Sequence, residues 1–208
     1  MIEGGVPARK IVAIGQPVDL DRFTPTVKES LPSEGPLRIC FVGSLDLRKG
    51  FIYLLRAIRA VGSEHVELRI VGATGDRWSR MLFQKESRYL NLSCITGDPI
   101  STYGWSEILI LPTLEDGFGF VVPEAMASGL PVIVTDACGA AELVNRNWNG
   151  WIVSSASVNE LIDAISRALR LRSELSEMGR RARRDIEKKA GQEWLDVLCH
   201  WFYAAPRE

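Results

Sequence analysis

Short apolar runs recur along the chain, and segments with helical periodicity separate them. The run at 108–111, Ile-Leu-Ile-Leu, is continuously apolar, which is typical of a strand in a parallel sheet that is covered on both faces. None of the links between the runs is a two-residue hairpin. This alternation predicts an α/β fold with a doubly wound, Rossmann-like parallel sheet and right-handed crossovers. The predicted strands are 37–43, 66–72, 92–97, 108–111, 132–134 and 151–153.

The segments between the strands predict helices of different lengths. An amphipathic helix begins at Phe51, and Asp76 is the expected N-cap of the next helix. Residues 98–107 are too few for a long helix. Pro123 suits a first helical position, because the N–H that it lacks has no helical partner there, and Gly129 ends that helix. The other predicted helices are 140–145, which is rich in turn residues, 158–172 and one that starts near Ser176.

Residues 1–36 differ from the rest of the chain. The strand-like run 11–14 has no neighbouring strand nearby in sequence, and the stretch 22–36 carries three prolines among scattered polar residues. Prolines and polar residues without periodicity indicate a linker. The predicted organisation is therefore the end of a preceding domain and a linker at 1–36, followed by one domain at 37–208.

The composition is that of a soluble globular protein, with 46% hydrophobic and 25% charged residues. A formal net charge of −1, without interleaved aromatic and basic residues, argues against a nucleic-acid partner. The four cysteines lie far apart and form no C-x-x-C pair, which favours reduced thiols. The sequence contains no run of 18 apolar residues and no signal peptide, so we expect a cytoplasmic protein.

The stretch 111–124 combines glycines with two carboxylates. Gly117 and Gly119 follow the carboxyl end of a strand, where open α/β sheets bind their ligands. Backbone N–H groups there, together with the start of the next helix, can hold an anion. Asp116 and Glu124 would repel an anion, so we expect their carboxylates to bind hydroxyl groups. An anion flanked by hydroxyls describes a nucleotide sugar.

Several motifs, taken in order, resemble the C-terminal domain of a family 4 retaining glycosyltransferase. That domain is the donor-binding, C-terminal half of the GT-B architecture. The first strand ends in Phe-Val-Gly at 41–43 and leads to Lys-Gly at 49–50, as in the family. Two acids with seven residues between them surround a Gly-Phe-Gly at 116–124, and Glu-Ala-Met-Ala-x-Gly-x-Pro-Val follows at 124–132. The segments 138–144 and 149–150 resemble the stretch that usually comes next.

The chain departs from the family pattern in three places. The first acid is Asp116 where glutamate is usual, and Glu115 beside it would give the wrong spacing of eight. Ser44 follows the first-strand glycine where the family often has an arginine. The stretch 97–112 is shorter than in the family, so we expect a remodelled rim near the nucleotide.

The resemblance implies roles for three charged residues. Lys49 would neutralise the donor diphosphate, whose negative charge grows as the sugar–phosphate bond breaks. Asp116 would accept hydrogen bonds from sugar hydroxyls, and these two residues are the predicted catalytic pair. Glu124 would bind the two ribose hydroxyls. The donor would be a UDP- or GDP-sugar, with no metal and no other cofactor.

The remaining predicted donor-binding residues contribute backbone groups or line the nucleotide. The backbone at 117–119 would offer N–H groups to sugar and phosphate, and Phe118 would pack rather than stack on a base. Gly43, Ser44 and Arg48 would lie near the diphosphate. The base pocket would include Gly72, Ala73 and Thr96.

The resemblance also bears on partners. An enzyme of this kind has an N-terminal domain that binds the acceptor, so this chain would be a donor-binding half that needs such a domain. One alternative is a non-catalytic nucleotide-sugar-binding or assembly module that acts with a partner subunit, and another is a GT-B-like nucleotide-sugar epimerase. The basic run 180–189 suits the solvated side of a helix, with contact to a membrane surface or to an anionic acceptor as the alternatives.

Overall fold

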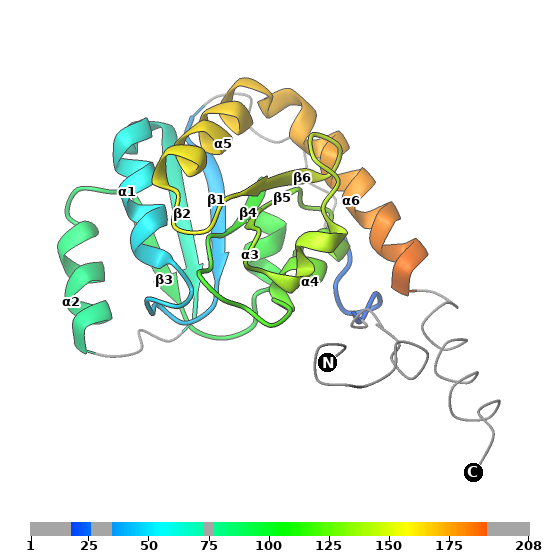
Figure 1. Cartoon of the computed structure of the whole chain (residues 1–208), viewed down its shortest axis with the longest axis horizontal. Coiled ribbons are helices and arrows are strands. Elements are labelled where there is room, and N and C mark those ends of the chain that lie inside the picture. Colours follow the sequence, from blue (N-terminus) through cyan, green and yellow to red (C-terminus); the bar gives the residue numbers. More distant parts are fainter. Residues whose placement is uncertain (1–17, 26–34, 73–76, 191–208) are drawn as a thin grey trace, which may run out of the picture.

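The computed structural model describes residues 18–25, 35–72 and 77–190. This part of the chain forms a six-stranded sheet in the order β3-β2-β1-β4-β5-β6, and each neighbouring pair is parallel (Figure 1). The chain reverses its direction of travel across the sheet between β1 and β4, which is where doubly wound sheets bind ligands. The strands are β1 (Leu37–Val42), β2 (Val66–Val71), β3 (Leu92–Ile95), β4 (Ile108–Leu111), β5 (Val132–Thr135) and β6 (Gly150–Val153).

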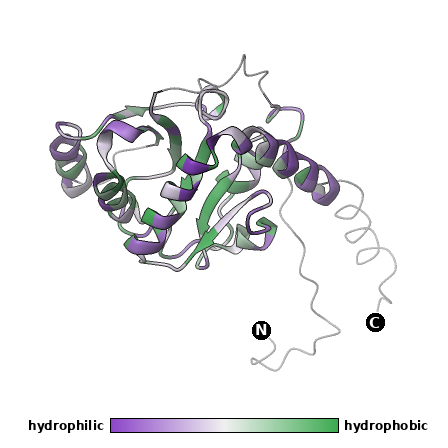
Figure 2. Cartoon of the chain, turned by 90° about the horizontal axis from the view of Figure 1, so that it is seen from above, coloured by the Kyte–Doolittle hydropathy of each residue, from purple (hydrophilic) through white to green (hydrophobic). Residues whose placement is uncertain are grey.

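Each face of the sheet has its own hydrophobic core. In β1, Ile39 and Phe41 belong to one core, while Cys40 and Val42 belong to the other. Successive strand residues point to opposite faces, so a strand that is covered on both sides must be apolar at every position. Figure 2 shows these hydrophobic strands inside, between helices that carry hydrophilic residues. The continuous apolar runs in the sequence follow from this arrangement.

The helices form a layer on each face of the sheet. The first core contains buried residues of α1 and α5, which pack against each other, and α2 adds partly buried side chains to it. The second core contains residues of α3, α4 and the later part of α6. The helices are α1 (Phe51–Val61), α2 (Arg77–Glu86), α3 (Ile100–Trp105), α4 (Val121–Ala127), α5 (Val158–Arg170) and α6 (Leu175–Ala190).

The structure confirms the predicted fold class and corrects several element boundaries. Helix α4 begins at Val121, so Pro123 is its third residue and not its first. The first four N–H groups of any helix lack an intrahelical acceptor, so a proline fits anywhere in the first turn. The predicted strand 92–97 ends at Ile95, and the predicted helix 140–145 is the 3₁₀ helix Gly139–Leu143. Asp76 and the run 11–14 lie outside the described residues.

Glycines let the ends of neighbouring strands approach closely. Gly50 has φ +69°, and a Cβ there would lie 1.8 Å from the carbonyl oxygen of Pro112. A Cβ on Gly72 would lie 2.1 Å from the carbonyl oxygen of Gly43. A side chain at either position would push apart the loops that leave β1, β2 and β4. These loops form the edge of the sheet that carries the predicted site.

Candidate donor-binding site

Two charged side chains meet where the strand order reverses. Lys49 ends the loop after β1, and Asp116 lies in the loop after β4, 67 positions further along the chain. The Lys49 Nζ forms an ion pair with Asp116 Oδ2. The two side chains are 15% and 12% exposed, so water screens the pair only partly. The structure thus brings together the two residues that we predict to be catalytic.

Hydrogen bonds to Asp46 hold the loop that carries Lys49. Its Oδ1 accepts the backbone N–H of Lys49 at 2.7 Å, and its Oδ2 accepts the hydroxyl of Ser44 at 2.5 Å. Ser44 is therefore occupied within its own loop. The methylene groups of Lys49 lie 3.8 Å from the place where a Cβ of Gly43 would be, so the lysine stem lies over this glycine.

The loops after β1 and β4 are also joined through the backbone of Arg48. Its carbonyl oxygen accepts the N–H of Leu114 at 2.7 Å and the hydroxyl of Thr113 at 2.9 Å. The exposed Arg48 guanidinium donates to the carbonyl oxygen of Glu115 at 3.4 Å. The side chain of Glu115 is exposed, so Asp116 is the acid of this loop that faces the lysine.

The loop after β4 rests on the segment that follows β5. The N–H of Asp116 donates to the carbonyl of Ala137 at 3.1 Å, and the N–H of Gly139 donates to the carbonyl of Asp116 at 3.2 Å. These bonds extend the pairing of β4 and β5 beyond the strands, and they fix the backbone that carries Asp116.

The Cys138 side chain lies under the glycine loop. Its Sγ donates to the carbonyl of Phe118 at 3.1 Å. Burial raises the pKa of the Cys138 thiol to about 11, so the thiol keeps its proton near neutral pH. Gly119 has φ +85°, and a Cβ there would lie 2.6 Å from this sulfur. With Cys138 in this position, residue 119 has no room for a side chain and must be glycine.

Glu124 lies in the first turn of α4, on the same edge of the sheet. Its Oε2 accepts a hydrogen bond from the hydroxyl of Tyr103 at 3.0 Å. Burial raises the pKa of Glu124, while the bond from Tyr103 and the charge of Arg22 act in the opposite direction. Glu124 is only partly buried, so its carboxylate stays accessible to a ligand hydroxyl.

The other predicted residues lie in the loops that follow β4, β2 and β3. Gly117 is exposed, and Phe118 packs edge-on against Phe120 with ring centroids 5.5 Å apart. Gly72 follows β2 beside Gly43, as described above. Thr96 follows β3, two strands away from β1, and is exposed. Ala73 lies outside the described residues.

Sequence reasoning missed three residues that build this site. Asp46 had a local signal, because an Asx side chain commonly accepts a backbone N–H a few residues further on. Tyr103 had no signal, and the resemblance at 138–144 includes Cys138 without indicating its contact with Phe118, because each of the two residues contacts a position about twenty residues away.

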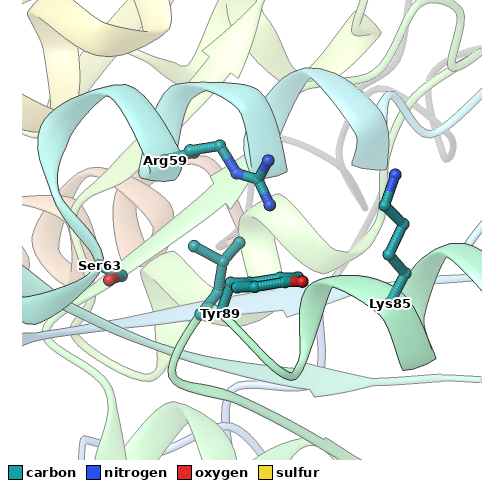
Figure 3. A pocket seen from close by; sticks show the side chains of 5 residues that line it. Arg59, Ser63, Lys85 and Tyr89 are labelled. Carbon is teal, nitrogen blue, oxygen red and sulfur yellow. The ribbon is translucent and has the colours of Figure 1, made fainter.

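A pocket elsewhere in the molecule lies at the opposite edge of the sheet. It has a volume of about 330 Å³ and lies between the ends of α1 and α2, before the first residues of β2 and β3 (Figure 3). Arg59 and Lys85 point into it beside the ring of Tyr89. Arg59 is already paired with Glu86 at 2.6 Å. This pocket takes no part in the site at the carboxyl ends of the strands.

Several arginines of the basic run on α6 form ion pairs with glutamates of the same helix. Glu177 pairs with Arg180 at 2.7 Å and with Arg184 at 3.2 Å, and Glu187 pairs with Arg183 at 2.6 Å. Within the described ranges, no helix combines the length and the apolar character that crossing a bilayer requires.

The strand order and the helix layers define an α/β domain with a candidate binding site at the switch point of its sheet. The model of the family "Glycosyl transferases group 1" matches residues 36–170, which is more than half of the chain. The chain belongs to this family of glycosyltransferases.

Individual relatives and solved structures agree with the family. The chain is 28% identical over 157 residues to the capsular polysaccharide biosynthesis glycosyltransferase CapM of Staphylococcus aureus, covering 73% of this chain and 41% of CapM. Anabaena Alr3699/HepE, solved in complex with UDP-glucose, shares its fold with a TM-score of 0.77 at 18% identity, over 95% of this chain and 59% of that one. The C-terminal domain of LpcC, a group 1 glycosyltransferase from Francisella tularensis, has a TM-score of 0.70 at 19% identity, over 83% of this chain and 97% of that domain.

The chain spans half the length or less of the curated relatives that it matches first, between 31% and 50% of each.

Proposed function

We propose that this chain is the donor-binding, C-terminal half of a family 4 retaining glycosyltransferase. The full enzyme would transfer a sugar from a nucleoside diphosphate sugar to an acceptor hydroxyl. The observation that carries the proposal is the meeting of Lys49 and Asp116 at the switch point. HepE, which shares the fold, binds UDP-glucose, and this supports the same class of donor here.

The ion pair suggests which residue would bind each part of the donor, with Lys49 on the diphosphate and Asp116 on the sugar. A diphosphate carries more negative charge than a carboxylate, so it would draw Lys49 away from Asp116. The released carboxylate would then accept hydrogen bonds from the sugar. As the bond between the anomeric carbon and the phosphate oxygen breaks, its electron pair goes to the diphosphate, and the Lys49 ammonium stabilises that charge.

Glu124 would bind the ribose. A carboxylate that accepts one hydrogen bond from Tyr103 at Oε2 retains free lone pairs, and a vicinal diol can donate two hydrogen bonds to them. The chain would act together with an acceptor-binding domain. The 97% coverage of the LpcC C-terminal domain supports this assignment of the half.

Calorimetry with UDP, GDP and the corresponding sugar nucleotides tests the proposal. Lys49→Met should weaken the binding of the preferred nucleoside diphosphate about tenfold or more, which corresponds to roughly 1.4 kcal/mol. Lys85→Met, in the pocket of Figure 3, is the matched control and should change nothing. If no nucleoside diphosphate binds, or if the two variants behave alike, the proposal is wrong.

Asp116→Asn separates the two roles. It removes the competitor for Lys49, so the sugar-free diphosphate should bind as well as before or more tightly. The additional affinity that the sugar gives should be lost. An equal loss for both ligands would show that Asp116 supports the loop and does not contact the sugar.

A further inference from the structure

The carboxylate of Glu124 is held from one side by a single buried hydroxyl. Tyr103 is fully buried in the core between α3 and α4, and its hydroxyl lies 3.0 Å from Glu124 Oε2. The same hydroxyl lies 3.4 Å from the carbonyl of Val121. A phenol has one proton to donate, and the shorter contact to a charged acceptor is the stronger bond.

The Tyr103 hydroxyl stays a donor at neutral pH and below. Burial, together with the charge of Glu124, raises the pKa of Tyr103 well above its usual value. The hydroxyl therefore keeps its proton at neutral pH and below.

The ring of Tyr103 is itself fixed by the segment 18–25. Phe23, which is 5% exposed, contacts it edge-on with ring centroids 6.2 Å apart. The guanidinium of Arg183 donates to the carbonyl of Phe23 at 2.6 Å and to that of Ala127, in α4, at 2.8 Å. One side chain of α6 thus joins the segment that packs on Tyr103 to the helix that carries Glu124.

We propose that Tyr103 is a positioning residue for ribose recognition, which holds Oε2 of Glu124 so that the rest of the carboxylate faces the ribose hydroxyls. The inference rests on the proposed function and extends it to a residue outside the sequence motif. Tyr103 does not contact the donor in this arrangement, and it acts through Glu124.

The expected effect is a loss of discrimination between ribose and its analogue without hydroxyls. Wild-type protein should bind UDP or GDP, whichever is preferred, roughly tenfold or more tightly than the 2′,3′-dideoxy form. In Tyr103→Phe this ratio should fall roughly three- to tenfold, while the dideoxy form binds as it does to wild type. Tyr53→Phe, which removes a hydroxyl from α1 on the other face of the sheet, should leave the ratio unchanged.

The pH dependence gives a second readout that a merely structural role would not move. Among the residues that the structure describes, three groups act on Glu124: the Tyr103 hydroxyl and the Arg22 charge lower its pKa, and the Asp98 charge raises it. Without the hydroxyl, the carboxylate takes up its proton at a higher pH. The ribose preference of Tyr103→Phe should therefore disappear at a higher pH than that of wild type as the solution is acidified.

The outcomes separate the two levels of the proposal. If wild-type protein binds no nucleoside diphosphate, the proposed function fails and the inference fails with it. If it binds and discriminates, but Tyr103→Phe keeps the wild-type ratio and pH profile, only the inference is overturned. If Tyr103→Phe does not fold, the NMR resonance of the ring carbon Cζ of Tyr103 in wild-type protein tests the inference instead. It should shift with the ribonucleotide and not with the dideoxy form, and an equal shift with both overturns the inference.

Discussion

The contact between Gly119 and Cys138 makes a stability prediction that the structure quantifies. An alanine at position 119 would keep φ near +85° and place its Cβ 2.6 Å from Cys138 Sγ and 3.2 Å from Leu111 Cδ2. The left-handed backbone costs a residue with a Cβ about 1–2 kcal/mol. Moving Cys138 and Leu111 away from the new Cβ costs about 1–3 kcal/mol more. The smaller unfolded-state entropy of alanine returns about 0.4–1 kcal/mol.

Gly119→Ala should therefore lower the free energy of unfolding by about 1–5 kcal/mol. Gly117→Ala is the matched control two positions earlier, since a Cβ there meets nothing within 4 Å and its φ lies outside the left-handed region. That control should change the free energy of unfolding by no more than about 1 kcal/mol. Urea unfolding followed by far-ultraviolet circular dichroism measures both, provided that the m-value stays constant.

A double-mutant cycle identifies the sulfur as the cause. Cys138→Ala removes the atom that the new Cβ would strike, so the double variant should be more stable than the sum of the single effects predicts, by about 1–2 kcal/mol. The backbone cost and the Leu111 contact remain in the double variant. If the cycle is additive within about 0.5 kcal/mol, or if Gly119→Ala behaves like Gly117→Ala, the reasoning about this loop is wrong.

Two further predictions concern one partly buried acid, Glu124, and one fully buried acid, Glu107. The pKa of Glu124 is raised in the folded protein, so folding disfavours its charged form. At pH 7, Glu124→Gln should therefore unfold at a higher urea midpoint than wild type. This difference should vanish as the pH falls below about 4.5, where the acid is neutral in both the folded and the unfolded state. The Glu107 side chain is 0% exposed and its carboxylate accepts Arg172 at 2.7 and 2.8 Å, so Arg172→Ala should cost about 3–5 kcal/mol of unfolding free energy in urea titrations, against no more than about 0.5 kcal/mol for the exposed Arg170→Ala.

Much of the fold is predictable from the sequence, because burial on both faces leaves a plain signal. Ile108 and Leu109 belong to opposite cores, so both must be apolar, and the run is visible without any structure. The residue at which a helix begins is less well determined by the sequence. Pro123 is compatible with each position of the first turn, so its presence cannot distinguish a start at Val121 from a start at 123.

Some residues of the candidate site can also be predicted from the sequence, and others cannot. Asp116 and Glu124 lie in one short stretch with a recognisable spacing, and Lys49 follows a strand that ends in glycine, so each carries a local signal. Tyr103 lies in a six-residue helix without amphipathic periodicity, and Cys138 has the properties of any small buried side chain. Their contacts exist only once β1, β4 and β5 have brought separate loops to one edge.

The arrangement at this edge is not the one that folding alone favours. A half-buried carboxylate with a raised pKa works against the folded state at neutral pH, and a largely buried ion pair is often no more stable than apolar residues of the same volume. Residues that lower stability persist where function requires them. We propose that Glu124 and the Lys49–Asp116 pair belong to this group, because both lie at the carboxyl ends of the strands. In that proposal a charged, hydroxylated ligand would account for them together, because it would pair with the lysine and donate hydrogen bonds to both carboxylates at once.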